Sequence, residues 1–104
     1  MLTAIERQEM ISNIQQLPAQ VESAIKGLDD QQLDTPYRDG GWTSRQVVHH
    51  LADSHLNAFI RMKLILTENH PTLKPYDQDA WANLADVKQP VHSSISILRG
   101  LHER

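Results

Sequence analysis

Residues 41–68 read GWTSRQVVHHLADSHLNAFIRMKLILTE, and they predict one long helix from about Ser44 to Glu68. Thr43 and Gln46 have the spacing of a capping box, in which each side chain hydrogen-bonds an otherwise unpaired backbone amide of the first turn. Apolar residues cover more than half of the helix circumference: Val47, Val48, Leu51, Ala52, Leu56, Ala58, Phe59, Ile60, Met62, Leu64, Ile65 and Leu66. A helix with so wide an apolar surface must pack against neighbours on most of its sides.

The segment before this helix reads as a second long helix. Apolar residues three and four positions apart predict a helix from Thr3 to Leu28. Pro18 lies inside it, and we expect a kink or a break there because proline has no amide hydrogen to donate. A short turn through Leu33 and the loop DTPYRDGG at residues 34–41 then lead to the capped helix.

The segment after it predicts shorter elements. Residues 71–77 (PTLKPYD) contain two prolines and read as a loop, and Asp77 is placed to cap a short helix that carries Trp81 and Leu84. A third helix is expected to start at Pro90, with one apolar face made of Val91, Ile95, Leu98 and Leu101. No segment has the alternating pattern of a strand. The sequence therefore predicts an all-α fold with two long antiparallel helices, short helices and the start of a third.

Composition limits the possible functions. The 104 residues suffice for a single domain, residues 1–104, and 10 Lys and Arg against 13 Asp and Glu give no basic surface for nucleic acid. The absence of cysteine excludes disulfides, thiolate metal sites and thiol nucleophiles. No run of apolar residues is long enough to span a membrane, and the first residues lack a signal-peptide core. We therefore expect a cytoplasmic protein that binds neither nucleic acid nor membrane.

Histidine is the one residue type here that suggests chemistry. His49, His50 and His55 share the long helix, but His49 and His50 point about 100° apart and do not chelate one ion. His55 lies in the apolar stripe, where we expect a partly buried, hydrogen-bonded structural histidine. His50 starts a polar row with Ser54, Asn57 and Arg61 along one edge, and both a packing role and a ligand role remain open for it. No HxxxH or HExxH motif is present.

Three segments together resemble the YfiT-like branch of the DinB superfamily. They are QLDTPYRDGGWTSRQVVHHLADSH at residues 32–55, IRMK at residues 60–63 and TLKPYDQDAWANL at residues 72–84. The resemblance extends from about Arg7 to the C-terminal LHER. It implies a four-helix bundle that binds one divalent metal ion, zinc or nickel, through three histidines. The family is described as containing metal-dependent hydrolases and bacillithiol S-transferases.

The resemblance assigns one metal ligand in this sequence. The second histidine of VVHHLADSH is a ligand in the family and corresponds to His50. The other two come from an HxxxH motif on a later helix, and the sequence ends before such a motif. In the family, the metal would act as a Lewis acid that holds a thiol as thiolate or lowers the pKa of a bound water. With one of three ligands present, activity of this chain alone is not expected.

These features leave three functional hypotheses. In the first, a homodimer rebuilds a four-helix bundle, and the second chain, His92 or His102 completes a metal site that acts on a small thiol or an electrophilic small molecule. In the second, the chain is a non-catalytic, oligomerising helical remnant or interaction module. In the third, it is a fragment of a longer enzyme. No catalytic residue is assigned under any of them.

Overall fold

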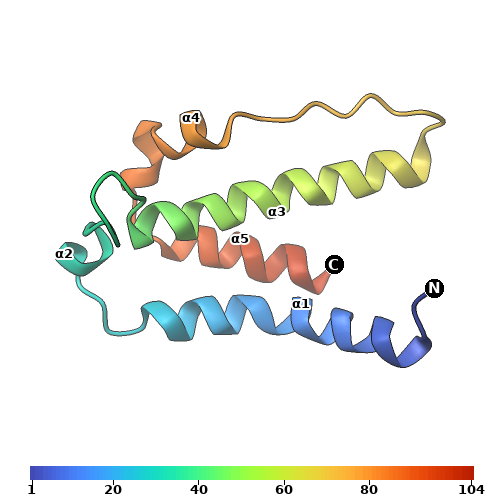
Figure 1. Cartoon of the computed structure of the whole chain (residues 1–104), viewed down its shortest axis with the longest axis horizontal. Helices are drawn as coiled ribbons and strands as arrows, with labels where there is room; N and C mark the ends of the chain where they lie inside the picture. The colour runs from blue at the N-terminus through green and yellow to red at the C-terminus, as the bar shows by residue number, and fades with distance from the viewer.

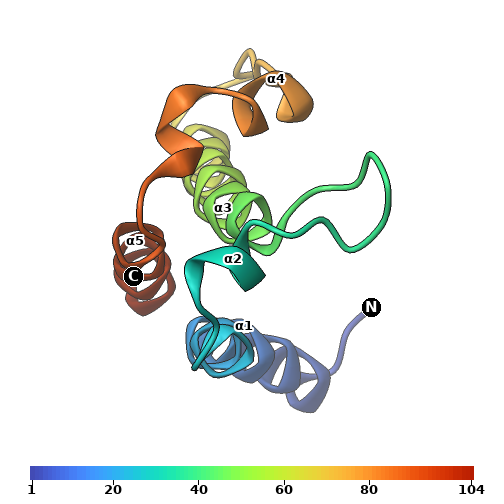
Figure 2. The same cartoon turned by 90° about the vertical axis from the view of Figure 1, so that its left-hand side faces the viewer.

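The computed structural model describes residues 1–104, and its regular elements are all helices joined by loops (Figure 1), as the sequence predicts. Its elements are α1 (Ala4–Ile25), α2 (Asp30–Leu33), α3 (Ser44–Thr67), α4 (Gln78–Ala82), a 3-10 helix η1 (Ala85–Lys88) and α5 (His92–Glu103). None of the helices is both long and apolar enough to cross a membrane. Seen end-on in Figure 2, α1, α3 and α5 occupy three corners of a bundle, and α4 lies on the far side of α3 from α1.

The predicted capping box sets the start of α3. Thr43 Oγ1 accepts from the amide of Gln46 at 3.1 Å, and Gln46 Oε1 accepts from the amide of Thr43 at 2.9 Å. Gln46 also donates to the carbonyl of Ala82 at 2.9 Å, which ties the end of α4 to the first turn of α3. The cap thus fixes both where the helix starts and where the following short helix packs.

Three boundaries differ from the sequence predictions. Of the kink or break predicted at Pro18, the break does not occur: α1 is one continuous helix of 22 residues that bends along its length, and Pro18 is buried. The third helix begins at His92 rather than at Pro90, with Val91 as an N-cap that makes no side-chain hydrogen bond. Leu84 lies beyond α4, because Asn83 ends that helix before η1 begins.

Arg45 joins three parts of the chain. It is buried, with 6% of its surface exposed, and donates to Asp34 at 2.7 Å and to Asp30 at 2.9 Å. It also donates to the carbonyl of Gln89 at 3.2 Å, just before α5. The hydrogen bonds that it donates to Asp34 and Asp30 raise the pKa of the guanidinium above its ordinary value. The buried charge is thereby paired, and it holds α2, α3 and the entry to α5 together.

The core is small and lies at one end of the bundle. Only 11 of the 104 residues are buried, and the apolar ones are Leu33, Val48, Ala52, Ala82, Val87, Ile95 and Leu98. α5 has 12 residues and α3 has 24, so α5 can accompany only about half the length of α3. The other half of α3 exposes Met62, Ile65 and Leu66. The expectation of neighbours on most sides therefore holds within this chain only for the first half of α3.

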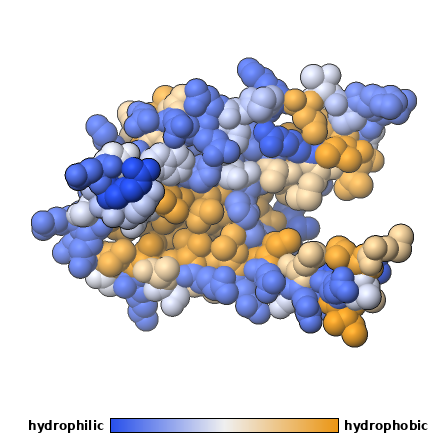
Figure 3. Space-filling view, in the orientation of Figure 1, coloured by the Kyte–Doolittle hydropathy of each residue, from blue (hydrophilic) through white to orange (hydrophobic).

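The exposed apolar surface is concentrated at the open end. Figure 3 shows apolar atoms on the facing sides of α1 and α3 there, with a hollow between them. The accessible surface is 7866 Å², whereas a compact monomer of 11.9 kDa exposes about 5,900 Å². The radius of gyration is 15.7 Å against roughly 13 Å for a compact domain of this length. The bundle is therefore open along one side.

Candidate functional site

The three histidines of α3 have three different environments, and His49 is the most enclosed. It is 7% exposed; its Nδ1 lies 2.6 Å from Ser94 Oγ and its Nε2 lies 2.8 Å from the carbonyl oxygen of Gln89. Because a carbonyl only accepts, Nε2 carries the hydrogen, and the neutral ring accepts from Ser94 at Nδ1. Both nitrogens are therefore used, and His49 serves to join α3 to α5.

His50 has neither ring nitrogen engaged. It is half-buried, and the ring of Trp42 meets it edge-on with centroids 4.9 Å apart and planes at 72°. No hydrogen bond joins its side chain to any other group of the chain, so both nitrogens remain available. Trp42 thus restricts the His50 ring without consuming a ligand atom.

His55 pairs with His102, a contact that the sequence reading did not predict. His55 Nδ1 and His102 Nε2 are 2.7 Å apart, and the rings stack with centroids 4.7 Å apart. His102 Nδ1 donates to the carbonyl of Ile14, so in the neutral pair Nδ1 of His55 is the donor. Burial, followed by the charges of His102 and His50, lowers the pKa of His55. The expected structural, hydrogen-bonded role of His55 is confirmed, and the pair joins α1, α3 and α5.

The structure does not complete a metal site around His50. No group of three His, Asp or Glu side chains lies close enough to hold one ion. His102 is committed to His55 and Ile14, and His92 is exposed at the start of α5. The hypothesis that His92 or His102 supplies the remaining ligands within one chain is therefore not supported. The donor set present is a single imidazole, which does not by itself fit a zinc or nickel centre.

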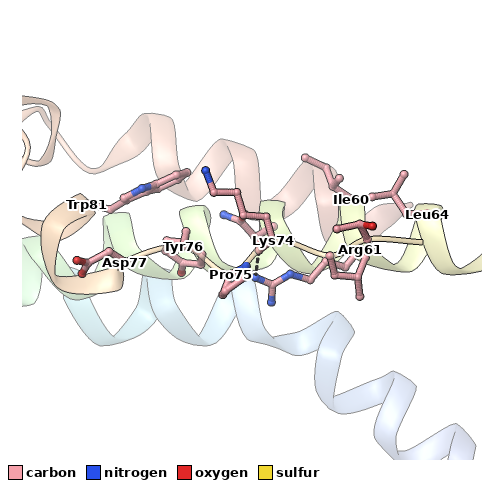
Figure 4. Close-up of a pocket in the computed structure, with 11 residues that line it drawn as sticks. Ile60, Arg61, Leu64, Lys74, Pro75, Tyr76, Asp77 and Trp81 are labelled. Carbon is pink, nitrogen blue, oxygen red and sulfur yellow. Dashed lines mark hydrogen bonds between the residues drawn. The ribbon is translucent and has the colours of Figure 1, made fainter. Parts of the chain in front are cut away.

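The polar row along α3 leads from His50 to a groove. Asn57 donates to the carbonyl of Asp53 at 2.8 Å, and Arg61 donates to the carbonyl of Lys74 at 3.3 Å. Asn57 and Arg61 line a groove of about 630 Å³ between α3 and the loop that returns to α4 (Figure 4). Ser54 precedes the groove on the same helix edge. The prediction that these side chains share an edge thus identified one wall of the groove, whereas the opposite wall depends on the path of the loop.

Asp53 lies three residues beyond His50 and has a perturbed acidity. Burial, followed by the charge of Asp86 on η1, raises the pKa of the Asp53 carboxyl, and the electrostatic influence of the neighbouring His49 and His50 side chains partly opposes this rise. His49 and Asp53 are four residues apart on α3 and therefore share a face, but nothing in the sequence indicates that η1 brings Asp86 close.

Helical bundles can build metal sites from side chains on facing helices, and the unbonded imidazole of His50 lies on one helix of such a bundle. Comparison with known proteins identifies the family. The sequence model of the DinB superfamily matches residues 13–102, and the chain belongs to that superfamily.

Named relatives agree with this assignment. The chain is 57% identical over 94 residues to proteins of Bacillus cereus strain AH820 and Bacillus thuringiensis subsp. konkukian, both named "Putative metal-dependent hydrolase". The match covers 90% of this chain and 54% of each relative, so the chain spans about half the length of these relatives. A solved structure, YfiT from Bacillus subtilis, superposes with a TM-score of 0.95 at 48% identity and covers 100% of this chain and 60% of that one. Its description is a probable metal-dependent hydrolase with an unusual four-helix bundle topology.

Proposed function

We propose that this chain provides His50 as one ligand of a divalent-metal centre in a DinB-type metal-dependent hydrolase or thiol S-transferase. The observation that carries the proposal is that His50 is the α3 histidine with both ring nitrogens unbonded, whereas His49 is locked by Ser94 and Gln89. Trp42 restrains the His50 ring by an edge-on contact, which limits the orientations of a potential ligand. The relatives named as metal-dependent hydrolases support a divalent metal in general.

The further ligands must come from groups that this single chain does not bring together. No set of three donor side chains converges within one copy, so no reaction step is derived from a metal held by this chain alone. We propose a second copy of the chain as the source, with zinc or nickel as the ion and a small thiol or an electrophilic small molecule as the substrate.

Metal content tests this proposal directly. The purified chain is incubated with zinc or nickel and desalted, and its metal is then measured by elemental analysis beside native mass spectrometry. We expect retained metal in the wild type and loss of it in His50→Ala. The matched control is His70→Ala, an exposed histidine in the loop after α3 that no hypothesis makes a ligand, and it should retain the metal. Absence of metal from the wild type, or equal metal in wild type and His50→Ala, would refute the proposal.

A second candidate function is a non-catalytic module that associates through its apolar side. The observation that favours it is the surface of 7866 Å², about 1,900 Å² more than a compact monomer of this mass exposes. That excess is in the range that one partner of an obligate dimer buries. Under this candidate the chain forms a dimer but binds no metal. The enzyme proposal requires a dimer that also retains metal. Native mass and metal content, measured together, therefore separate the two candidates.

A further inference from the structure

The groove beside α3 has two walls of different kinds. One wall is the helical edge with Asn57, Ile60, Arg61 and Leu64, and the other is the extended loop from Thr72 to Asp77, with Trp81 of α4 at the end (Figure 4). Its volume of about 630 Å³ lies within the usual range for small-molecule sites. Because the loop runs back along the helix, residues more than ten positions apart face the same space.

The charges at the groove are predominantly positive and unpaired. Neither Arg61 nor Lys74 forms an ion pair, since the ion pairs of the chain involve Arg45 and Arg99 alone. Arg61 uses one N–H on the carbonyl of Lys74, which leaves four of its five donors free. The single carboxylate at the groove, Asp77, accepts from the amide of Ala80 as the cap of α4. An anion would therefore meet two free cations and one carboxylate that is already engaged.

Unused backbone N–H groups near the groove also favour an anion. The amides of Thr72, Leu73, Lys74 and Tyr76 donate to no group of the chain, because the loop forms neither a strand pair nor a turn bond. Backbone N–H groups are good donors to carboxylate and phosphate oxygens. The extended wall therefore has a cation at the groove and unused backbone N–H groups in the same segment.

The other end of the groove is apolar and aromatic. The rings of Tyr76 and Trp81 lie 4.6 Å apart with planes at 51°, and Trp81 remains 37% exposed. Ile60 is 49% exposed and Leu73 is 39% exposed at the same groove. The hydroxyl of Tyr76 is covered and has no hydrogen-bond partner, so the aromatic pair carries one unused polar group.

We infer that this groove binds a small organic anion with a flat apolar group, its carboxylate or phosphate on Arg61 and Lys74 and its ring against Tyr76 and Trp81. Two free cations alone would attract any anion, whereas the neighbouring rings select one that carries apolar surface. The site lies about 10 Å along the helix from His50, as the seven residues from His50 to Asn57 require. Binding there needs no metal, so the inference is independent of the proposed metal centre.

Titration of the full chain with 3-phenylpropionate, followed by amide chemical shifts, tests the inference. We expect saturable shifts at residues 57–64 and 72–77 and at the Trp81 indole. Arg61→Gln and Lys74→Gln should each weaken binding about fivefold to tenfold, because each removes charge-assisted hydrogen bonds. The neutral amide 3-phenylpropionamide should bind at least about tenfold more weakly than the acid.

Two controls distinguish this site from general electrostatic attraction. Lys63→Gln removes the same charge from the same helix, but Lys63 lines a different groove, so binding should be unchanged. Trp81→Leu should weaken 3-phenylpropionate while leaving inorganic phosphate unaffected. Far-UV circular dichroism of each variant verifies the fold. Equal affinity for acid and amide, an equal loss in Lys63→Gln, shifts elsewhere or no saturable shift in the low-millimolar range would overturn the inference.

Discussion

His49 and His50 are adjacent in sequence and have opposite roles. One residue along a helix turns the side chain by about 100°, which points His49 toward α5 and leaves His50 beside Trp42. Ser94 and the carbonyl of Gln89 use both nitrogens of His49. The difference between a structural histidine and a candidate ligand is therefore set by which neighbour each ring meets.

Replacing these two histidines should separate their roles. His49→Ala leaves Ser94 buried without its partner and creates a cavity, so we expect the free energy of unfolding to fall by about 2 kcal/mol or more. His50→Ala removes no hydrogen bond and should change it by less than about 1 kcal/mol. Urea unfolding followed by circular dichroism measures both. Similar losses of unfolding free energy for the two variants would contradict the conclusion that His49 is structural and His50 is not.

The His55–His102 pair should make stability depend on pH. The pKa of His55 is lowered in the folded chain, so the unfolded chain takes up a proton first as the pH falls below about 6.5, and acidification then favours unfolding. In His55→Gln, the free energy of unfolding should change less with pH between about pH 7.5 and 5 than it does in the wild type. His92→Gln, at an exposed site, is the control and should leave the dependence unchanged. A wild-type free energy of unfolding that is constant over this range would disprove the prediction.

The helices begin where local chemistry sets them. Thr43 with Gln46 and Asp77 with Ala80 are caps whose partners lie three residues away, and both were predicted from sequence. Pro18 did not break α1. Proline costs this helix one backbone hydrogen bond, but the contacts of α1 with α5 hold the rest of the helix in place. Tertiary packing thus outweighed a local penalty.

Arg45 holds the elements around the start of α3 together, and its removal should be costly. Arg45→Met retains the buried stem and loses the hydrogen bonds to Asp34, Asp30 and Gln89, so we expect a loss of about 1 to 3 kcal/mol in the free energy of unfolding. The control is Arg99→Met, which breaks an exposed pair with Glu22 and should cost less than about 1 kcal/mol. If chemical denaturation gave the same loss of unfolding free energy for both variants, the buried hydrogen bonds of Arg45 would contribute no more than the exposed pair of Arg99.

The molecule as a whole exposes more surface than a compact monomer of its mass, and many of its large apolar side chains are exposed. Ile14, Phe59, Met62, Leu66 and Leu101 line an apolar groove of about 460 Å³ between α1, α3 and α5. The groove continues the line of the short α5 along the longer α3. Water contact over this surface is unfavourable, and burial against a second copy would remove it.

Light scattering at micromolar concentration should therefore report twice the chain mass of 11.9 kDa. Met62→Glu and Leu66→Glu, which place charges in the apolar groove, should shift the equilibrium to the monomer. Leu84→Glu is the matched control, because Leu84 is 54% exposed but lies outside that groove, and it should remain dimeric. A single species of 11.9 kDa for the wild type would exclude self-association.

The sequence by itself determined the helices, their caps, the edge shared by His50, Asn57 and Arg61, and the family. These features depend on spacing within one helix or on adjacent residues, and such short-range geometry is written directly in the order of side chains. Only the tertiary structure decided that His55 meets His102, that Arg45 pairs with Asp30 and Asp34, and that Lys74 faces Arg61. Each of these contacts joins residues from different elements, and the packing of whole helices and the path of a loop bring them together.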